Sequence, residues 1–239
     1  MEDYKHLRIS KAVLQNPRRK HKPGMPSTVR SNIPQHAAML ATQLQGSIKT
    51  AKEQPSTKTD SYVLKINLTG SFSVEGLRAQ GVEFISQEGN EVYIGFINEL
   101  GLSTFTERLS MLGAGIEDLS YKNLLLAIDN IGNWTAEDRK SWALKRYGLP
   151  KTDSFKLDVE LWPISQTGSP ERKNLTDSFE QWLSNQGIKK LDRVSRESLL
   201  MYRVELTTEQ ANQLLNHADV RCIDLMPSSG ISYQKKDLP

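Results

Sequence analysis

The chain has 239 residues, of which 37% are hydrophobic and 25% charged, so it is long enough for one large core or two small ones, and we expect two. The longest largely apolar run, residues 123–128, is far too short to cross a bilayer, and the charged N-terminus is unlike a secretory signal. One cysteine, Cys222, excludes an internal disulfide and fits a cytoplasmic protein.

Positive charge is concentrated in the first part of the chain. Residues 1–30 contain eight basic and two acidic side chains, whereas the whole chain has a net charge of only +3. The stretch 16–30 carries prolines and a glycine rather than the aromatic residues that would accompany a nucleic-acid surface. We therefore interpret residues 1–32 as a basic flexible arm, or a protein-docking segment, and favour this over nucleic-acid binding.

Residues 33–60 are predicted to form a helix and a linker. Apolar side chains recur three and four positions apart from Ile33 to Ala51, and Pro34 occupies a first-turn position, as is typical of an amphipathic helix. The polar stretch from Lys52 to Ser61 has no such period, which indicates a loop.

The first compact unit is predicted over residues 61–116 with the order β-α-β-β-α. Alternating apolar residues predict a strand at Tyr62–Leu68, and a short helix follows from Ser73 to Gln80, ended by Gly81. Residues 82–97 read as two strands about a turn at residues 88–90, and a helix runs over residues 103–112. Tyr62 and Tyr93 fall at core positions, which argues against a nucleic-acid-binding sheet.

The second unit, residues 153–226, repeats this order and completes it as β-α-β-β-α-β, the split βαβ arrangement. Its predicted elements are a strand at 155–161, a helix ended by Gly187, strands at 188–194 and 199–206, a helix capped by Thr207 with Gln210, and a strand at 220–225. Leu214 and Leu215 lie on the buried face of the last helix, and Tyr202 lies in the core. The fold class is thus α+β, with two ferredoxin-like (split βαβ) units that have antiparallel sheets, preceded by the basic arm and the amphipathic helix.

Residues 117–152 are predicted to be a helical connector. Thr135 with Asp138 predicts a helix start, and Gly148 with Pro150 predicts its end. Trp134, Trp142 and Leu144 could form a binding surface, but they are better explained as residues that dock this helix onto the sheets.

No catalytic or cofactor motif is found in the sequence. The four histidines are scattered without metal-ligand spacing, and neither a phosphate-binding glycine loop nor a nucleophile-elbow serine is present. Cys222 lies mid-strand, where a buried, inert thiol is expected. Asp158 and Glu160 alternate along a strand and are expected to keep its solvent side hydrated. We therefore predict no cofactor, no metal and no enzymatic activity of this chain.

The stretch "LTTEQANQLLNHADV" at residues 206–220 is followed by a polar tail that contains proline. With these features the second unit resembles the propeptide inhibitor domain of subtilisin-like serine proteases (subtilases). "HLRI", "NWTAEDR", "LDVELWP" and "DVRCIDL" are similar to the long N-terminal region of intracellular bacterial subtilases, a group often encoded beside an AAA-type ATPase. The three motifs that carry the Ser-His-Asp triad are absent, so the catalytic domain is missing from this chain.

The resemblance implies a function and a partner. Such a propeptide packs its sheet on the protease domain, in cis or in trans, and its extended tail, here residues 227–239, enters the substrate cleft, so the chain would act as an inhibitor and a folding assistant. Because these clefts prefer apolar side chains, the candidates for cleft binding are Leu225, Met226, Ile231, Tyr233 and Leu238. An AAA-type ATPase is a further implied partner. The alternatives are a non-inhibitory protein-interaction module that docks a protease or ATPase and, less favoured, nucleic-acid binding through the sheet.

Overall fold

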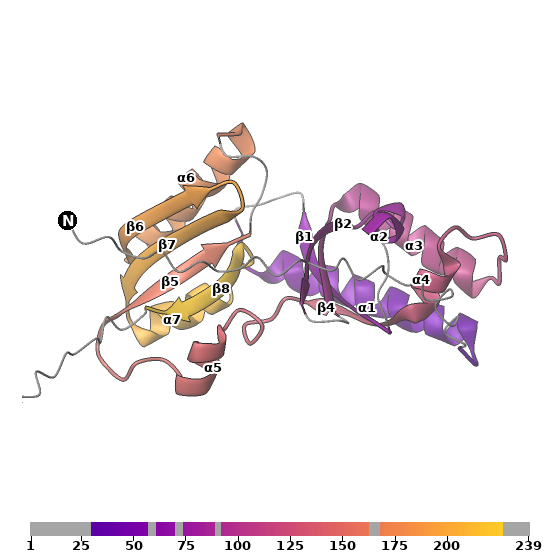
Figure 1. Ribbon diagram of the computed structural model, residues 1–239, viewed down its shortest axis with the longest axis horizontal. Helices are drawn as coiled ribbons and strands as arrows, with labels where there is room; N and C mark the ends of the chain where they lie inside the picture. Colours follow the sequence, from indigo (N-terminus) through magenta and orange to yellow (C-terminus); the bar gives the residue numbers. More distant parts are fainter. Residues whose placement is uncertain (1–29, 57–60, 70–73, 89–91, 163–167, 227–239) are drawn as a thin grey trace, which may run out of the picture.

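The computed structural model describes residues 30–56, 61–69, 74–88, 92–162 and 168–226. These residues form two α/β units joined through residues 134–154, with the first sheet seen nearly edge-on and the second more nearly face-on (Figure 1). The predicted α+β class with two antiparallel sheets is confirmed. None of the helices in these described ranges is long and apolar enough to cross a membrane. The predicted arm and tail lie outside the described residues, except Arg30 to Asn32.

The first unit begins with the long helix α1, Ile33–Glu53. It is followed by β1 (Tyr62–Leu68), α2 (Val74–Ala79), β2 (Glu83–Glu88), β3 (Val92–Ile97), α3 (Glu99–Gly113), α4 (Lys122–Ala127) and β4 (Ile128–Asn133). The Asn32 side chain accepts a hydrogen bond from the Gln35 amide and caps α1, and the Asn98 side chain caps α3 in the same way. The predicted helix over residues 103–112 therefore begins four residues earlier than its apolar stripe suggested.

The first sheet has the strand order β2-β3-β1-β4, with all neighbours antiparallel. Strand β4 pairs along β1, with Ile131 opposite Ile66. The prediction that this unit ends at residue 116 as β-α-β-β-α, and that residues 117–152 are a helical connector, is therefore wrong. Residues 122–133 supply a short helix and a fourth strand, and the first unit completes the same β-α-β-β-α-β order as the second.

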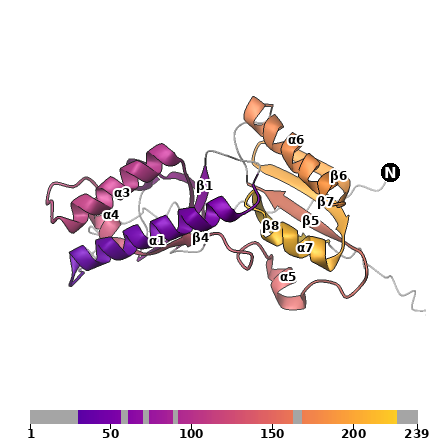
Figure 2. The ribbon, with the colours of Figure 1, turned by 180° about the vertical axis from the view of Figure 1, so that it is seen from behind.

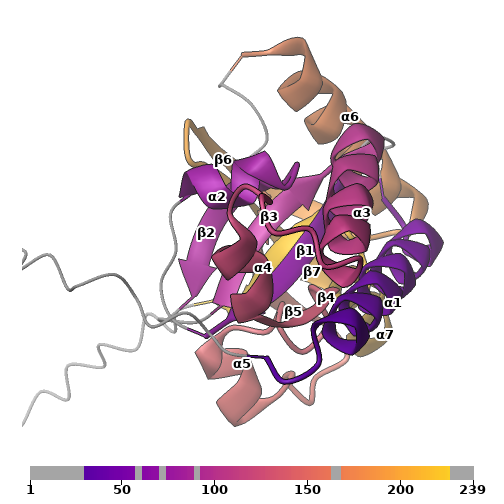
Figure 3. The same cartoon turned by 90° about the vertical axis from the view of Figure 1, so that its right-hand side faces the viewer.

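Helices cover one face of this sheet, and Figure 3 shows α1 and α3 side by side. The core beneath them is formed by alternate residues of β1 (Leu64, Ile66, Leu68) together with apolar side chains of α1 (Leu40, Leu44, Ile48) and α3 (Phe105, Leu109, Leu112). These side chains are at most 5% exposed. Apolar residues recur every second position in the strands and about every 3.6 positions in the helices, so each element has one apolar face. Burial of these faces in a common core sets the orientation of the strands and the helices.

Close backbone packing fixes the position of α3 on this core. Gly81 follows the end of α2 and has a φ of +81°. A Cβ on Gly101 would lie 2.2 Å from the Gly81 carbonyl oxygen. Only glycine permits this approach, because any side chain at position 101 would overlap the backbone of residue 81. The two glycines therefore set how near α3 lies to the turn before β2.

The second unit comprises β5 (Phe155–Leu161), α6 (Pro170–Asn185), β6 (Lys189–Arg196), β7 (Leu199–Leu206), α7 (Thr208–Leu215) and β8 (Val220–Leu225). Three of its four predicted strands have the predicted bounds. The capping box of Thr207 and Gln210 is present at the start of α7, and Gly187 follows α6 with a φ of +66°.

The second sheet has the order β6-β7-β5-β8, which is the order of the first sheet. Helices α6 and α7 lie on one face (Figure 2), over a core that includes Leu157, Val159, Phe179 and Val204. Leu214 and Leu215 are buried as predicted, and Tyr202 is fully buried. In the first unit Tyr93 is buried and Tyr62 is partly buried. The described strands therefore present no row of exposed aromatic side chains.

The segment between the units contains the helix α5, Trp142–Tyr147. Thr135 and Asp138 form a reciprocally bonded turn rather than a helix start, and α5 begins after the Ser141 cap. The end at Gly148 is as predicted, with a φ of +73°. Leu144 is buried against the second core, as expected, whereas Trp142 is 67% exposed, so the prediction that it docks the helix onto a sheet is wrong.

Candidate binding sites at the seam between the units

The two units meet along a seam that contains three aromatic side chains. Phe96 comes from the face of the first sheet that the helices leave free, Trp134 follows β4, and Trp162 follows β5. Trp162 makes edge contacts with both, at centroid distances of 6.2 Å to Phe96 and 5.6 Å to Trp134, and it is only 1% exposed. Edge-to-face aromatic packing of this kind holds the units together.

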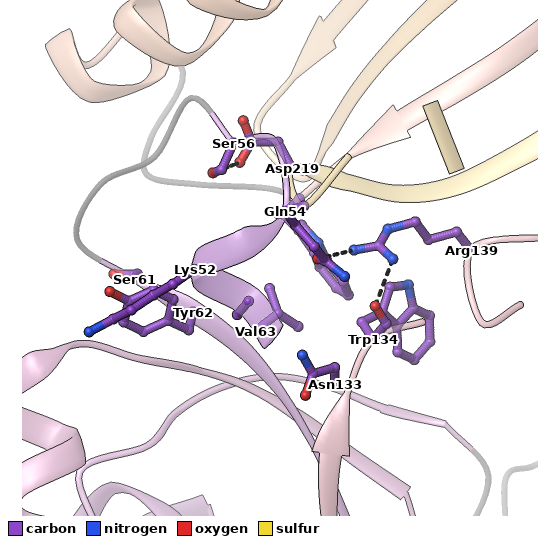
Figure 4. A pocket seen from close by; sticks show the side chains of 13 residues that line it. Lys52, Gln54, Ser56, Ser61, Tyr62, Val63, Asn133, Trp134, Arg139 and Asp219 are labelled. Atoms are coloured by element: carbon purple, nitrogen blue, oxygen red, sulfur yellow. Dashed lines mark hydrogen bonds between the residues drawn. The ribbon is translucent and has the colours of Figure 1, made fainter. Parts of the chain in front are cut away.

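A cavity of about 250 Å³ lies beside these rings (Figure 4). Its walls come from the end of α1, the start of β1, the end of β4 and the turn before β8, and they include Gln54, Tyr62, Asn133, Arg139 and Asp219. These polar groups stand beside apolar ones such as Val63 and Trp162, so the lining is mixed. A cavity of this size and lining suits water or a small molecule that has both polar and apolar groups.

Arg139 is the buried cation of this seam. Its side chain donates hydrogen bonds to the main-chain oxygens of Val220 (2.9 Å) and Trp134 (2.6 Å) and to Gln54 Oε1 (3.4 Å). In Figure 4 its guanidinium points toward both Gln54 and the Trp134 carbonyl. Burial lowers the pKa of Arg139 to about 10, so the group remains protonated at neutral pH. One guanidinium thus links α1, the end of β4 and β8.

A buried carboxylate lies on the other side of the cavity. Asp219 is 1% exposed and accepts a hydrogen bond from the Ser56 hydroxyl at 2.9 Å. The Ala218 amide donates to the Pro55 carbonyl, also across the seam. Polar and main-chain contacts therefore fix the end of α1 to the turn that precedes β8.

His217 lies behind Asp219 within the second core. Its Nδ1 accepts a bond from the Asp219 amide (3.3 Å), which places the proton of a neutral ring on Nε2. The ring packs against Trp182 and Phe179 and is fully buried. Burial lowers the pKa of His217 to about 4, so the imidazole is neutral at physiological pH. Its Nδ1 also lies 4.0 Å from Asp219 Oδ2, so the ring packs between the aromatic side chains of the second core and the carboxylate that lines the cavity.

A second cavity, of about 410 Å³, lies between the two sheets. Its charged residues are Lys65, Asp138, Lys140, Lys145, Glu160 and Arg221. Lys65 pairs with Asp138 at 2.6 Å and Arg221 with Glu160 at 2.8 Å, so most of the charge is compensated. Lys145 has no ion-pair partner among the described residues. The cavity therefore carries a modest excess of positive charge.

Cys222 lines this second cavity from β8 and is partly exposed rather than fully buried as predicted. Burial, together with the nearby charges of Glu160 and Asp224, raises the pKa of the thiol to about 11. The thiolate is the reactive form of cysteine, so this protonated thiol agrees with the expected inert role.

The carboxylates predicted to keep β5 hydrated are ion-paired instead. Asp158 is only 9% exposed and accepts two hydrogen bonds from Arg203, at 2.8 and 2.9 Å. Glu160 pairs with Arg221. Both residues lie on the sheet face away from the helices, as the alternation indicated. The prediction that Asp158 is solvated there is wrong, because β7 places Arg203 opposite it, whereas Glu160 is partly exposed beside Arg221 of β8.

The histidines are not brought together. His36 lies on α1, where its Nε2 contacts the Leu125 carbonyl at 3.2 Å, and His217 lies in the other unit. His6 and His21 are outside the described residues. Within the described part of the chain, no group of histidine, cysteine and acidic residues is arranged to hold a metal ion.

The structure describes two of the five candidate cleft-binding residues. Leu225 ends the edge strand β8 and is partly buried against the second core, and Met226 follows it with 37% exposure. Ile231, Tyr233 and Leu238 lie outside the described residues. The chain therefore leaves the second sheet at its edge, immediately after Leu225.

The residues that build the seam were not singled out by the sequence reasoning. Arg139 and Trp162 fall within the stretches "NWTAEDR" and "LDVELWP", which carried the family resemblance, but no periodicity marks them as buried. The one available signal was their position in the chain. Arg139 directly follows a Thr-x-x-Asp turn and Trp162 directly follows a predicted strand, and at both places a neighbouring unit could contact the side chain.

Comparison with known proteins gives the same division of the chain. Residues 34–135 match the family model described as the Y4kK N-terminal domain, and residues 138–225 match the Y4kK central domain. Both units are similar to Y4kK domains. The chain is also 25% identical, over 97% of its length and 77% of the relative's, to a protein of Sinorhizobium fredii described as uncharacterized protein y4kK. The border between the two matches lies at residues 136–137, in the segment between the two units and close to Arg139. None of these names states an activity or a partner.

Proposed function

We propose that the chain is a propeptide-like region of a subtilisin-type serine protease, which inhibits the catalytic domain and assists its folding by placing its C-terminal tail in the substrate cleft. The main support is the architecture of the second unit. Residues 155–225 complete the β-α-β-β-α-β order, and the chain leaves from the edge strand β8 with Met226 exposed. A tail that leaves from a sheet edge is free to extend along a partner's cleft as an added strand.

The second sheet also offers a face for such a partner. On β7 the residues Leu199, Met201, Arg203 and Glu205 alternate with buried ones and are all partly exposed. They lie on the face opposite α6 and α7. Leu199 and Met201 make one end of this face apolar, and the Arg203 and Asp158 pair makes the other end polar. This combination suits packing against the helices of a folded protein domain.

Two consequences follow from this mechanism. The inhibitor is product-like, since the tail occupies the cleft as a peptide strand does. The chain would bind the folded protease but not the unfolded one. By mass action this binding shifts the protease toward its folded state, which is how such a region assists folding. In this proposal the catalytic triad belongs to the protease domain, and a parent protein that contains this domain would be the endopeptidase.

The second candidate is a non-inhibitory interaction module that docks a protease or an AAA-type ATPase. One observation favours it. The segment Arg139–Ser141 lies along the outer edge of β8, where the Ile223 amide donates to the Arg139 carbonyl (2.7 Å) and the Ser141 amide to the Ile223 carbonyl (2.9 Å). This edge is therefore already paired in part, and the unit is built into a larger two-unit body. Split βαβ units also serve many unrelated functions.

Inhibition of a purified bacterial intracellular subtilisin-type protease, assayed with a fluorogenic peptide, tests the proposal. We expect the intact chain to inhibit, and a chain that lacks residues 226–239 to keep its circular-dichroism spectrum while its inhibition constant rises at least about tenfold. A matched variant with Leu214→Asn should instead lose the fold of the second unit. Equal inhibition by the intact and shortened chains would exclude the tail mechanism, and binding without inhibition would favour the interaction module.

A further inference from the structure

Helix α5 displays an aromatic and basic surface, the α5 patch, formed by Trp142, Lys145, Arg146 and Tyr147. Trp142 and Tyr147 are each 67% exposed, which makes them two of the most exposed large apolar side chains in the described residues. Arg146 lies over both rings, at 5.1 Å from the Trp142 centroid and 5.7 Å from that of Tyr147. The guanidinium thus holds two exposed rings in a defined arrangement.

The helix beneath the patch is firmly fixed. The Ser141 hydroxyl accepts from the Leu144 amide at its start, and the Gly148 amide donates to the Leu144 carbonyl at its end. Leu144 is its one buried side chain, and the two main-chain bonds to Ile223 attach the preceding residues to β8. A surface that is ordered before binding loses little conformational entropy when a partner docks.

The charge of this segment is one-sided. Residues 140–151 contain four basic and no acidic side chains. Lys145, Arg146 and Lys151 are exposed and have no ion-pair partner within the described ranges, whereas Lys140 pairs with Glu137. Lys145 also lines the cavity between the sheets, so the positive potential continues from the α5 patch into that cavity. The complementary surface is acidic.

We propose that the α5 patch is a docking surface for an acidic protein segment in which carboxylates flank an aromatic or aliphatic side chain. Tryptophan, tyrosine and arginine are the residues that concentrate binding energy at protein interfaces, and here they occur together. The two rings stand at 90° to each other, so they do not offer parallel faces for successive nucleic-acid bases. Leu144 turns inward, which leaves too little apolar surface for insertion into a membrane. The proposal does not depend on the tail or on inhibition.

Selection of a displayed random-peptide library against the intact chain tests this proposal. We expect enrichment of peptides that carry several aspartates or glutamates around an apolar residue. Fluorescence anisotropy with the selected peptide should show at least about tenfold weaker binding for Trp142→Ala and for the double variant Lys145→Glu, Arg146→Glu. Melting temperatures should stay close to that of the intact protein, because all three side chains are exposed.

A matched control comes from the first unit. Tyr121 is 46% exposed and is followed by Lys122, so Tyr121→Ala with Lys122→Glu makes a similar change away from α5 and should leave peptide binding unaltered. Single-stranded oligothymidylate and vesicles that contain phosphatidylserine are measured in parallel. Selected peptides without acidic residues, equal binding by the α5 variants, or patch-dependent binding of the oligonucleotide or vesicles alone would each overturn the proposal.

Discussion

The seam between the units should depend on Arg139 more than on any other single polar side chain. Arg139→Met keeps much of the side-chain volume but removes three hydrogen bonds, to Val220, Trp134 and Gln54. It also leaves Asp219 buried without the neighbouring positive charge. Hydrogen bonds to charged groups contribute roughly 1.5–3 kcal/mol each, and removal of one member of a buried charged set costs about 3–5 kcal/mol. We expect a loss of about 3–5 kcal/mol.

Urea unfolding followed by tryptophan fluorescence measures this loss, since Trp134 and Trp162 flank the seam. Arg139→Lys should cost less than Arg139→Met, because the charge remains but the forked donor does not. Arg146→Met, which changes an exposed arginine, should lie within about 0.5 kcal/mol of the intact protein. If Arg139→Met unfolds within about 1 kcal/mol of the intact chain, the guanidinium does not hold the units together and the reasoning is refuted.

Three further predictions concern the cores. Gly101→Ala should destabilise the first unit by about 1–3 kcal/mol or more, because the new methyl group meets the Gly81 carbonyl. Gly46 has open space around it, so Gly46→Ala should instead raise the unfolding free energy by up to about 1 kcal/mol. His217 has a folded-state pKa of about 4, below the usual 6.5, so its contribution to stability should be fully present above pH 6.5. The unfolding free energy should then fall by up to about 3 kcal/mol as the pH drops toward 4. Urea unfolding at successive pH values measures this slope, which His217→Gln should flatten. Leu214→Ala should cost about 2–5 kcal/mol in thermal or urea unfolding, since the side chain is fully buried.

Most of the second unit could be predicted from the sequence, because several signals coincide there. Alternation fixed the bounds of β5, β7 and β8, and the Thr207 capping box fixed the start of α7. In the first unit β4 escaped detection. Its sequence "IDNIGN" has two buried isoleucines separated by polar residues and a glycine, and its pairing with β1 is set by tertiary contact.

The seam could not be predicted because it depends on contacts between distant parts of the chain. Arg139 is buried only where α1, β4 and β8 converge, and a local pattern gives an arginine no reason to be buried. Trp142 illustrates the opposite error. Leu144 is the one buried side chain of this short helix, so an apolar residue two positions earlier turns outward.

The two units share one strand order but are used differently. In the first, part of the helix-free face of the sheet is covered, because Phe96 packs on Trp162 of the second unit. In the second, the β7 face remains partly exposed, and the edge at β8 lies beside both the start of the tail and helix α5. The end of α1 also reaches the seam, so the first unit contacts the second through both its sheet and its first helix. Both proposals place the contact around β8, the first at the tail that follows this strand and the second at helix α5, which packs against it.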